Sequence, residues 1–152
     1  MEFEKHLCQL NLATMKTSLD HPSMKEFVDA LDSINQLAEE HQGFVWRLKD
    51  ETTGNASLLK PFGENILVNM SVWEDAESLR DFVYKSHHMK FLKRRAEWFE
   101  KVTVYQALWW VPKGHVPTQE EAKLKFEDLQ KNGSSSSVFG FTEALRTEAP
   151  HA

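Results

Sequence analysis

The sequence predicts an α+β fold. We expect a ferredoxin-like domain with the order strand, helix, strand, strand, helix, strand and an extra helix near the C-terminus. Two observations lead to this prediction. Apolar runs of strand length alternate with segments whose apolar residues recur at helical spacing. Proline, glycine and capping residues stand at the borders between these segments. The expected result is a four-stranded antiparallel sheet with helices on one face.

The first half of this fold is expected between residues 7 and 48. Residues 7–14 alternate well enough to predict the first strand. Pro22 suits the first turn of a helix, because the N–H that proline lacks would have no helical partner there. Apolar residues then recur at helical spacing to about Glu40. Gly43 ends this helix, and residues 44–48 predict the second strand.

The second half begins with the strongest strand prediction, residues 66–73, which are rich in β-branched side chains. Asp75 is a good N-cap for the following helix, because its carboxylate can accept from the free N–H groups of the first turn. Residues 102–111 predict the fourth strand. Thr118 and Glu121 have capping-box spacing, so a last helix is expected to begin there.

The domain is expected to span residues 1–132. The glycine and four serines at positions 133–137 predict a flexible joint, so residues 133–152 are interpreted as a Ser-rich joint and a C-terminal arm. Helices on one face of the sheet would leave its other face bare. An apolar sheet face is unstable in water, and we therefore expect two copies to pair face to face as a homodimer.

Composition excludes several classes of partner. The 152-residue chain carries a formal net charge of −5, with acidic and basic residues interleaved. Without a basic stripe, no nucleic-acid partner is expected. No leader-like segment is present, and no apolar run approaches the ~18 residues that span a bilayer, so no membrane partner is expected. Cys8 is the single cysteine, which excludes an internal disulfide and favours a cytoplasmic location.

Polar side chains interrupt two of the predicted strands. Gln9 and Asn11 share one face of the first strand, and Asn69, Ser71 and Trp73 share one face of the third, because strand side chains alternate with period two. Together they predict one wall of a pocket for a flat, mostly apolar molecule. The alternative is a hydrated, outward face, which antiparallel sheets often have.

A histidine and several tryptophans are further candidates. His88 has Phe91 and Leu92 at i+3 and i+4, so it is expected on the apolar face of its helix. A histidine there can be a proton donor, a proton acceptor or an iron ligand, or it can be a core histidine without a functional role. The remaining tryptophans have two possible interpretations, an aromatic cage around a ligand or ordinary packing in the core and at an interface. Adjacent residues of a strand face opposite sides, so only one of the last pair lines a given pocket. These tryptophans are Trp46, Trp98, Trp109 and Trp110.

No motif indicates a bound cofactor. The sequence has no phosphate-binding glycine loop, no HExxH, CxxC or GxSxG motif, and no Asp/Glu/His cluster with metal-ligand spacing. We therefore expect neither a metal nor a cofactor.

Several segments between Leu7 and about Phe141 match a known family pattern. The matching segments are residues 9–11, Met24 with Phe27 and Val28, residues 43–48, 67–74 and 79–84, Ser86 with His88, residues 98–99 and 108–112, and Gly114 with His115. In these segments the chain resembles a bacterial family known only as a domain of unknown function. The resemblance implies membership of the dimeric α+β barrel superfamily, which includes antibiotic-biosynthesis monooxygenases, haem-degrading enzymes and small stress or binding proteins.

The resemblance also implies roles for individual residues. The cofactor-free monooxygenases of that superfamily oxidise aromatic substrates that themselves activate oxygen, and an asparagine and a tryptophan of the enzyme assist. Asn11, Asn69 and Trp73 are residues of these types in this sequence. The haem-degrading branch uses asparagine, tryptophan and histidine, which Asn11, Trp73 and His88 supply. The separation of Trp73 and His88 is longer than in that branch, which counts against haem.

The leading hypothesis is a homodimer that binds a small aromatic or hydrophobic molecule in a cleft between sheet and helices and acts as a cofactor-independent monooxygenase. In it Asn11 and Asn69 polarise a substrate oxygen, and His88 shuttles the proton. The alternatives are a non-catalytic binding or stress-response dimer and a haem protein ligated by His88. The residues expected to shape and line the cleft are Trp73, Trp98, Trp46, Trp109 and Ser71.

Overall fold

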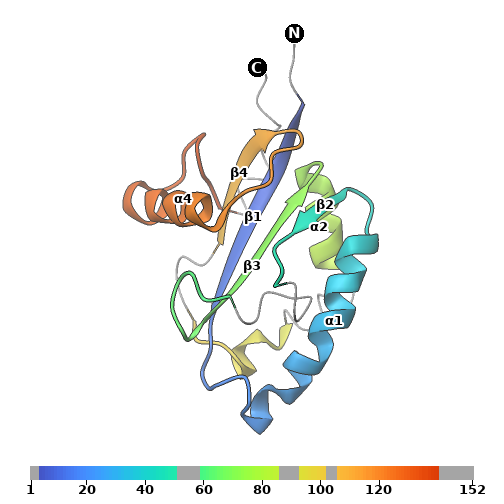
Figure 1. The fold of residues 1–152 in the computed structure, drawn as a ribbon, viewed down its shortest axis with the longest axis vertical. Coiled ribbons are helices and arrows are strands. Elements are labelled where there is room, and N and C mark those ends of the chain that lie inside the picture. Colours follow the sequence, from blue (N-terminus) through green and yellow to red (C-terminus); the bar gives the residue numbers. More distant parts are fainter. Residues whose placement is uncertain (1–3, 51–58, 86–92, 102–105, 141–152) are drawn as a thin grey trace.

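In the computed structural model, which describes residues 4–50, 59–85, 93–101 and 106–140, the strands form one antiparallel sheet. Neighbouring strands follow the order β2-β3-β1-β4 (Figure 1). β3 is antiparallel to both β1 and β2, so β1 and β2 are parallel with β3 between them. This is the split βαβ order of a ferredoxin-like fold, and the predicted α+β class is confirmed. The strands are β1 (Lys5–Thr14), β2 (Phe44–Arg47), β3 (Ile66–Trp73) and β4 (Gln106–Pro112).

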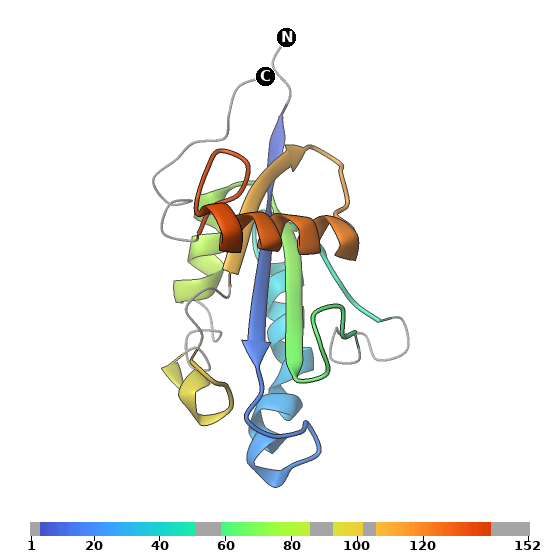
Figure 2. The same cartoon turned by 90° about the vertical axis from the view of Figure 1, so that its left-hand side faces the viewer.

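The helices lie on both sides of the sheet. α1 and α2 cover one face, and α4 crosses the other, so the described residues form three layers (Figures 1 and 2). None of the helices in the described ranges combines the length and apolar character that a membrane crossing requires. The helical elements are the 3-10 turn η1 (Pro22–Met24), α1 (Lys25–Glu40), α2 (Ala76–Lys85), the 3-10 turn η2 (Arg95–Glu97) and α4 (Gln119–Asn132).

Capping residues define where the later helices begin. The backbone N–H of Ser78 donates to Asp75 Oδ1 at 2.7 Å, as the N-cap prediction requires. At α4, the N–H of Glu121 donates to Thr118 Oγ1 at 3.1 Å. The reciprocal half of the predicted capping box does not form, because the Glu121 carboxylate accepts from Trp109 Nε1 and pairs with His115 instead.

The strand ends differ slightly from the prediction. β3 has the predicted bounds, β2 ends at Arg47, and β4 is described from Gln106 onward. The predicted strand residues 102–105 lie outside the described residues.

Gly43 forms the corner between α1 and β2. Its φ of +88° lies in the left-handed region that favours glycine. A Cβ atom at this position would lie 2.1 Å from Ser78 Oγ, at the start of α2. The absence of a side chain therefore lets the corner approach α2 closely.

The prediction that one sheet face is bare is wrong. The side chains of Cys8, Met70 and Val72 point to the α4 face and are at most 1% exposed. They form one core with residues of α4 and with Val138. The apolar face is therefore buried within a single chain, and the argument from a bare face no longer supports a homodimer. The α4 residues in this core are Ala122, Phe126 and Leu129.

The segment after α4 returns to the sheet. Phe139 and Leu108 exchange two backbone hydrogen bonds of 2.8 and 2.9 Å at the free edge of β4. Val138 and Phe139 are both buried. The first part of the predicted arm is thus fixed on β4, while residues 141–152 lie outside the described residues.

Candidate functional site

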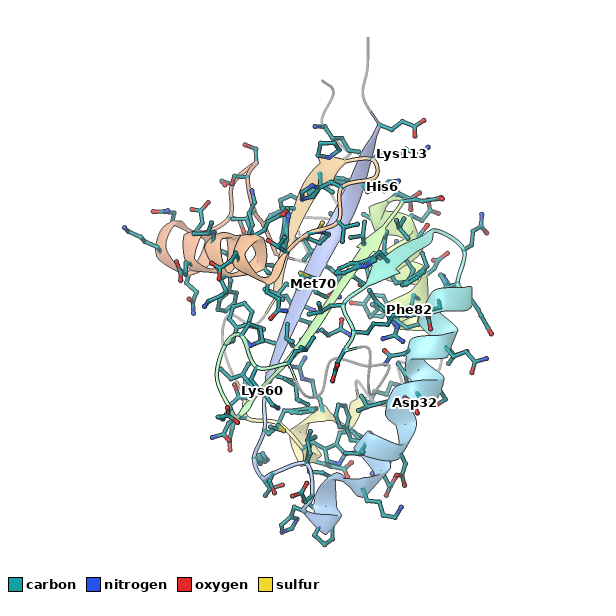
Figure 3. All side chains as sticks on the ribbon, in the orientation of Figure 1. His6, Asp32, Lys60, Met70, Phe82 and Lys113 are labelled. Carbon is teal, nitrogen blue, oxygen red and sulfur yellow. The ribbon has the colours of Figure 1, made fainter. Side chains whose placement is uncertain are left out.

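A cavity of about 310 Å³ lies between the sheet and the layer that contains α1 and α2. The sheet wall consists mainly of alternate residues of β1 and β3, because side chains of one parity share a face. In Figure 3, Phe82 of α2 lies on this side of the sheet and Met70 lies in the sheet itself. The wall residues of β1 and β3 that share this face are Gln9, Asn11, Ala13, Leu67, Asn69, Ser71 and Trp73.

Two polar rows cross the sheet wall. In the inner row, Arg47 of β2 is the register partner of Ser71, which pairs with Gln9 of β1. In the outer row, Asn69 pairs with Asn11, which pairs with Gln106 of β4. All six side chains line the cavity. The inner-row residues Gln9 and Ser71 are buried, whereas Asn69 is exposed, so the cavity opens toward solvent at the outer row.

Hydrogen bonds fix the inner row. Gln9 Nε2 donates to Asn69 Oδ1 at 2.6 Å and to Ser71 Oγ at 2.9 Å. Trp73 Nε1 donates to the same Ser71 Oγ at 2.8 Å. Ser71 Oγ therefore accepts from two donors, which is the full acceptor capacity of a hydroxyl. These contacts hold the polar wall in one geometry before any ligand arrives.

One end of the cavity is aromatic and centred on Trp73. The Trp73 ring stacks on Phe82 at 5.4 Å between ring centroids, with 28° between the ring planes. Phe44 meets the Trp73 ring edge-on at 5.5 Å. His41 packs against both Trp73 and Phe82, at 6.0 and 5.8 Å. Offset and edge-on pairs are the preferred arrangements of such rings, so this end is rigid and apolar.

The other end is a second aromatic cluster, around Trp98. Phe27 lies 5.6 Å from the Trp98 ring and 5.0 Å from Phe99. Trp98 Nε1 donates to the carbonyl oxygen of Ser23 at 3.0 Å. The Arg94 guanidinium lies over the Trp98 ring, 4.9 Å from its centroid. A cation over an indole face is attracted by the ring quadrupole, which helps to hold Trp98 in place.

The structure brings most of the predicted site residues together. Asn11, Asn69, Ser71, Trp73 and Trp98 all line the cavity. Asn11, Asn69, Ser71 and Trp73 share the sheet face that looks toward α1 and α2, and this face lines the cavity.

Two predicted tryptophans lie on the opposite face and do not line this cavity. Trp109 is the register partner of Cys8 and points toward α4, where its Nε1 donates to Glu121 Oε2 at 2.8 Å. Trp46 pairs with Val72 and packs against the core under α4. Trp109 and Trp46 thus follow their register partners to the α4 face. His88 lies outside the described residues.

Sequence reasoning missed Arg47 and Gln106, which line the cavity. A signal existed for both. Arg47 is a charged residue inside an otherwise apolar strand, and Gln106 lies two residues before Leu108, on the same face of β4.

Metal-binding and thiol chemistry would depend on clustered ligand side chains and on the reactivity of Cys8. No group of three His, Cys, Asp or Glu side chains in the described ranges is arranged to hold a metal ion. Burial raises the pKa of the Cys8 thiol, with a further contribution from the nearby Glu121 carboxylate. A thiol in this state is a poor nucleophile.

The topology and the cavity define a ferredoxin-like α+β protein with a half-polar internal site. The family model described as "Domain of unknown function (DUF3291)" matches residues 6–152, and the chain belongs to this family. The family resemblance drawn from the sequence motifs is thereby confirmed. No curated protein matches the chain.

Several solved structures are similar to this chain at low identity. A conserved protein from Methanosarcina mazei Go1 is 13% identical, with 72% of this chain and 94% of that chain covered and a TM-score of 0.48. SnoaB, a cofactor-independent oxygenase from Streptomyces nogalater, is 15% identical, with 75% and 99% covered and a TM-score of 0.46. A monooxygenase from the gene ActVA-Orf6 of Streptomyces coelicolor, in complex with nanaomycin D, is 13% identical, with 76% and 93% covered and a TM-score of 0.37.

Proposed function

We propose that the protein binds a small, flat, mostly apolar molecule in the cavity between the sheet and α1 and α2. The supporting observation is the cavity itself, about 310 Å³ in volume, with aromatic clusters at both ends and two polar rows between them. Apolar walls with a few fixed polar groups are typical of small-molecule sites, whose volumes begin at about 300 Å³.

The polar rows determine how such a molecule would lie. Asn69 Oδ1 accepts from Gln9, so the Asn69 Nδ2 group on the other side of that carboxamide remains to donate to a ligand oxygen. Asn11, its register partner, lines the cavity beside it. Rings of the ligand would contact Trp73 or Trp98, while its oxygen atoms would lie across the amides.

Isothermal titration calorimetry with 2-naphthol tests this proposal. Ala30 of α1 lines the cavity, so Ala30→Leu fills part of it and should abolish the binding heat. The matched control is Ala96→Leu, at an exposed position outside the cavity lining. Equal binding to both variants would mean that 2-naphthol does not occupy this cavity. An absence of binding to the unaltered protein would count against the proposal.

A cofactor-independent monooxygenase is the second candidate function. It is supported by the residue types that the family resemblance implies, since Asn11 and Asn69 form one row of the wall and Trp73 lies on the same face. With a quinol as substrate, one O₂ is consumed and a hydroxyquinone and water are formed, so each product receives one of its oxygen atoms. The amides would hold a substrate oxygen and stabilise the negative charge that forms as the quinol is deprotonated.

Oxygen uptake with a naphthohydroquinone distinguishes this enzyme from a non-catalytic binder. Uptake that exceeds spontaneous oxidation and is lost on Asn69→Ala supports catalysis. Binding without uptake above the spontaneous rate supports the alternative, a binding or stress-response protein. A Soret band after haem addition would instead support the haem hypothesis.

The proton shuttle remains a prediction for His88. We expect His88→Ala to abolish oxygen uptake while the circular dichroism spectrum stays unchanged, because no other group was predicted to carry the proton. His87→Ala is the matched control, because neighbouring helix residues point to different sides and the side chain of His87 is therefore predicted to point away from the apolar face. Full activity in His88→Ala would exclude the shuttle role.

A further inference from the structure

We propose that the ligand of the cavity is an anion, a flat apolar molecule with one carboxylate that Arg47 and the Ser71 hydroxyl hold at the β2 side of the sheet wall. This inference rests on the proposed cavity binding and adds the chemical class of the ligand.

The charge of the lining is the first observation. Arg47 and Arg95 line the cavity, and within the described ranges no aspartate or glutamate does. Electrostatic attraction is stronger in a site that excludes water than at the surface. An acidic ligand would therefore be favoured over a neutral one of the same shape, and a cationic ligand would be disfavoured.

The position of Arg47 is the second observation. Its side chain is only 13% exposed, and it stands beside Ser71 in the register of β2 and β3. The planar guanidinium fork matches the two oxygens of a carboxylate, which makes arginine the usual partner for this group. A mostly buried arginine in the wall of an apolar cavity would thus bind the carboxylate group of a ligand.

The ion pair of Arg47 with Glu39 is long. Glu39 Oε1 lies 3.5 Å from Arg47 Nη2, and the Glu39 side chain is 42% exposed. Direct charge-assisted bonds of this kind measure about 2.7 to 2.9 Å. A ligand carboxylate at the shorter distance would therefore compete with Glu39 for Arg47.

The hydroxyl of Ser71 supplies the third observation. Ser71 is 93% buried, given its 7% exposure, and its oxygen already accepts from Gln9 and Trp73. The remaining capacity of this hydroxyl is to donate its hydrogen. Ser71 lines the cavity, so a carboxylate oxygen placed between Ser71 and Arg47 would receive a bond from each.

Calorimetry with two isosteric probes tests the inference. At neutral pH 2-naphthoate carries a carboxylate and 2-naphthamide is its neutral analogue. We expect the unaltered protein to bind 2-naphthoate at least about tenfold more tightly than 2-naphthamide, a difference of about 1.4 kcal/mol. Arg47→Met should remove this preference, so that the two probes bind with similar affinities. Lys49→Met, a nearby exposed cation outside the lining, should keep the preference.

A second variant keeps the inference testable if Arg47→Met does not fold. Glu39→Gln removes one competing carboxylate at a partly exposed position. This variant should tighten 2-naphthoate binding about threefold, as expected for an ion pair of this exposure, without changing the affinity for 2-naphthamide. Weaker or unchanged 2-naphthoate binding in this variant would contradict the role of Arg47.

The possible outcomes distinguish a failure of the anion inference from a failure of the proposed small-molecule binding in the cavity. If 2-naphthol and 2-naphthamide bind and 2-naphthoate binds no better, the anion inference is overturned and cavity binding stands. If none of the three compounds binds, both proposals fail. A preference for 2-naphthoate that survives Arg47→Met in a folded protein would overturn the assignment of Arg47.

Discussion

A single oxygen atom of Ser71 joins the side chains of Gln9 and Trp73. Because this oxygen accepts from Gln9 and from the indole of Trp73, removing it leaves the buried Trp73 Nε1 without this partner and leaves Gln9 Nε2 bonded to Asn69 alone. An unsatisfied buried donor costs about 1 to 3 kcal/mol. Ser71 therefore contributes to stability as well as to the shape of the site.

We predict that Ser71→Ala lowers the free energy of unfolding by about 1 to 3 kcal/mol in urea denaturation. The control is Ser33→Ala, where the hydroxyl donates to the carbonyl of Ala30 on the exposed surface of α1, and the change should stay within about 0.5 kcal/mol. Equal effects of the two substitutions would contradict the role assigned to the Ser71 oxygen.

Single residues also mark how far the sequence predicts the site. The period of two in residues 66–73 places Asn69, Ser71 and Trp73 on one face, and the structure agrees. The same rule separates Trp109 from Trp110 without stating which of the two faces α1 and α2. That choice depends on the pairing of Trp109 with Cys8, which is a long-range register that local periodicity does not contain.

The corner at Gly43 acts at the scale of elements, because it joins α1 and β2 while touching the start of α2. We predict that Gly43→Ala destabilises the protein through both its positive φ and the close approach of Ser78.

Gly114 is a matched control for this prediction. It has a similar φ of +91°, but a Cβ atom there would meet nothing within 4 Å. The difference in the urea midpoint between Gly43→Ala and Gly114→Ala isolates the steric contribution. Gly43→Ala should unfold at the lower urea concentration. Identical midpoints would mean that the corner moves freely away from α2.

The sequence predicts where each helix begins better than it predicts the surface against which the helix packs. Asp75 and Thr118 begin their helices as expected, because a cap is a local contact of a few residues. The docking of α4 was not predicted. Ala122, Phe126 and Leu129 recur at helical spacing, yet this pattern states only that α4 has an apolar face and not which surface covers it.

The three-layer arrangement makes α4 part of the core of the whole molecule. Phe126 is 8% exposed in the core that α4 forms with the sheet, whereas Leu124 of the same helix is 66% exposed. We predict that Phe126→Ala costs about 3 to 5 kcal/mol of unfolding free energy. Leu124→Ala should cost less than about 0.5 kcal/mol. Chemical denaturation of both variants checks this, and similar small losses would mean that α4 is not essential to the fold.

The oligomeric state is a separate question at this scale. The homodimer expected from the family resemblance would need a surface other than the sheet face beneath α4, because that face is buried. Light scattering during size-exclusion chromatography, compared with the chain mass of 17.6 kDa, measures it directly. A dimer that persists in Leu124→Asp would exclude the exposed side of α4 as its interface.

The pairing of Phe139 with Leu108 has a consequence for the solubility of the molecule. Unpaired backbone groups along the outermost strand of a sheet can recruit a strand from another molecule and begin a fibril. Phe139 occupies part of this position beside β4. At the opposite border, β2 has only four residues and its register is interrupted between Phe44 and Trp46. We therefore expect the bridge at Leu108 and the short, interrupted β2 to hinder the addition of a strand from another molecule at the two borders of the sheet.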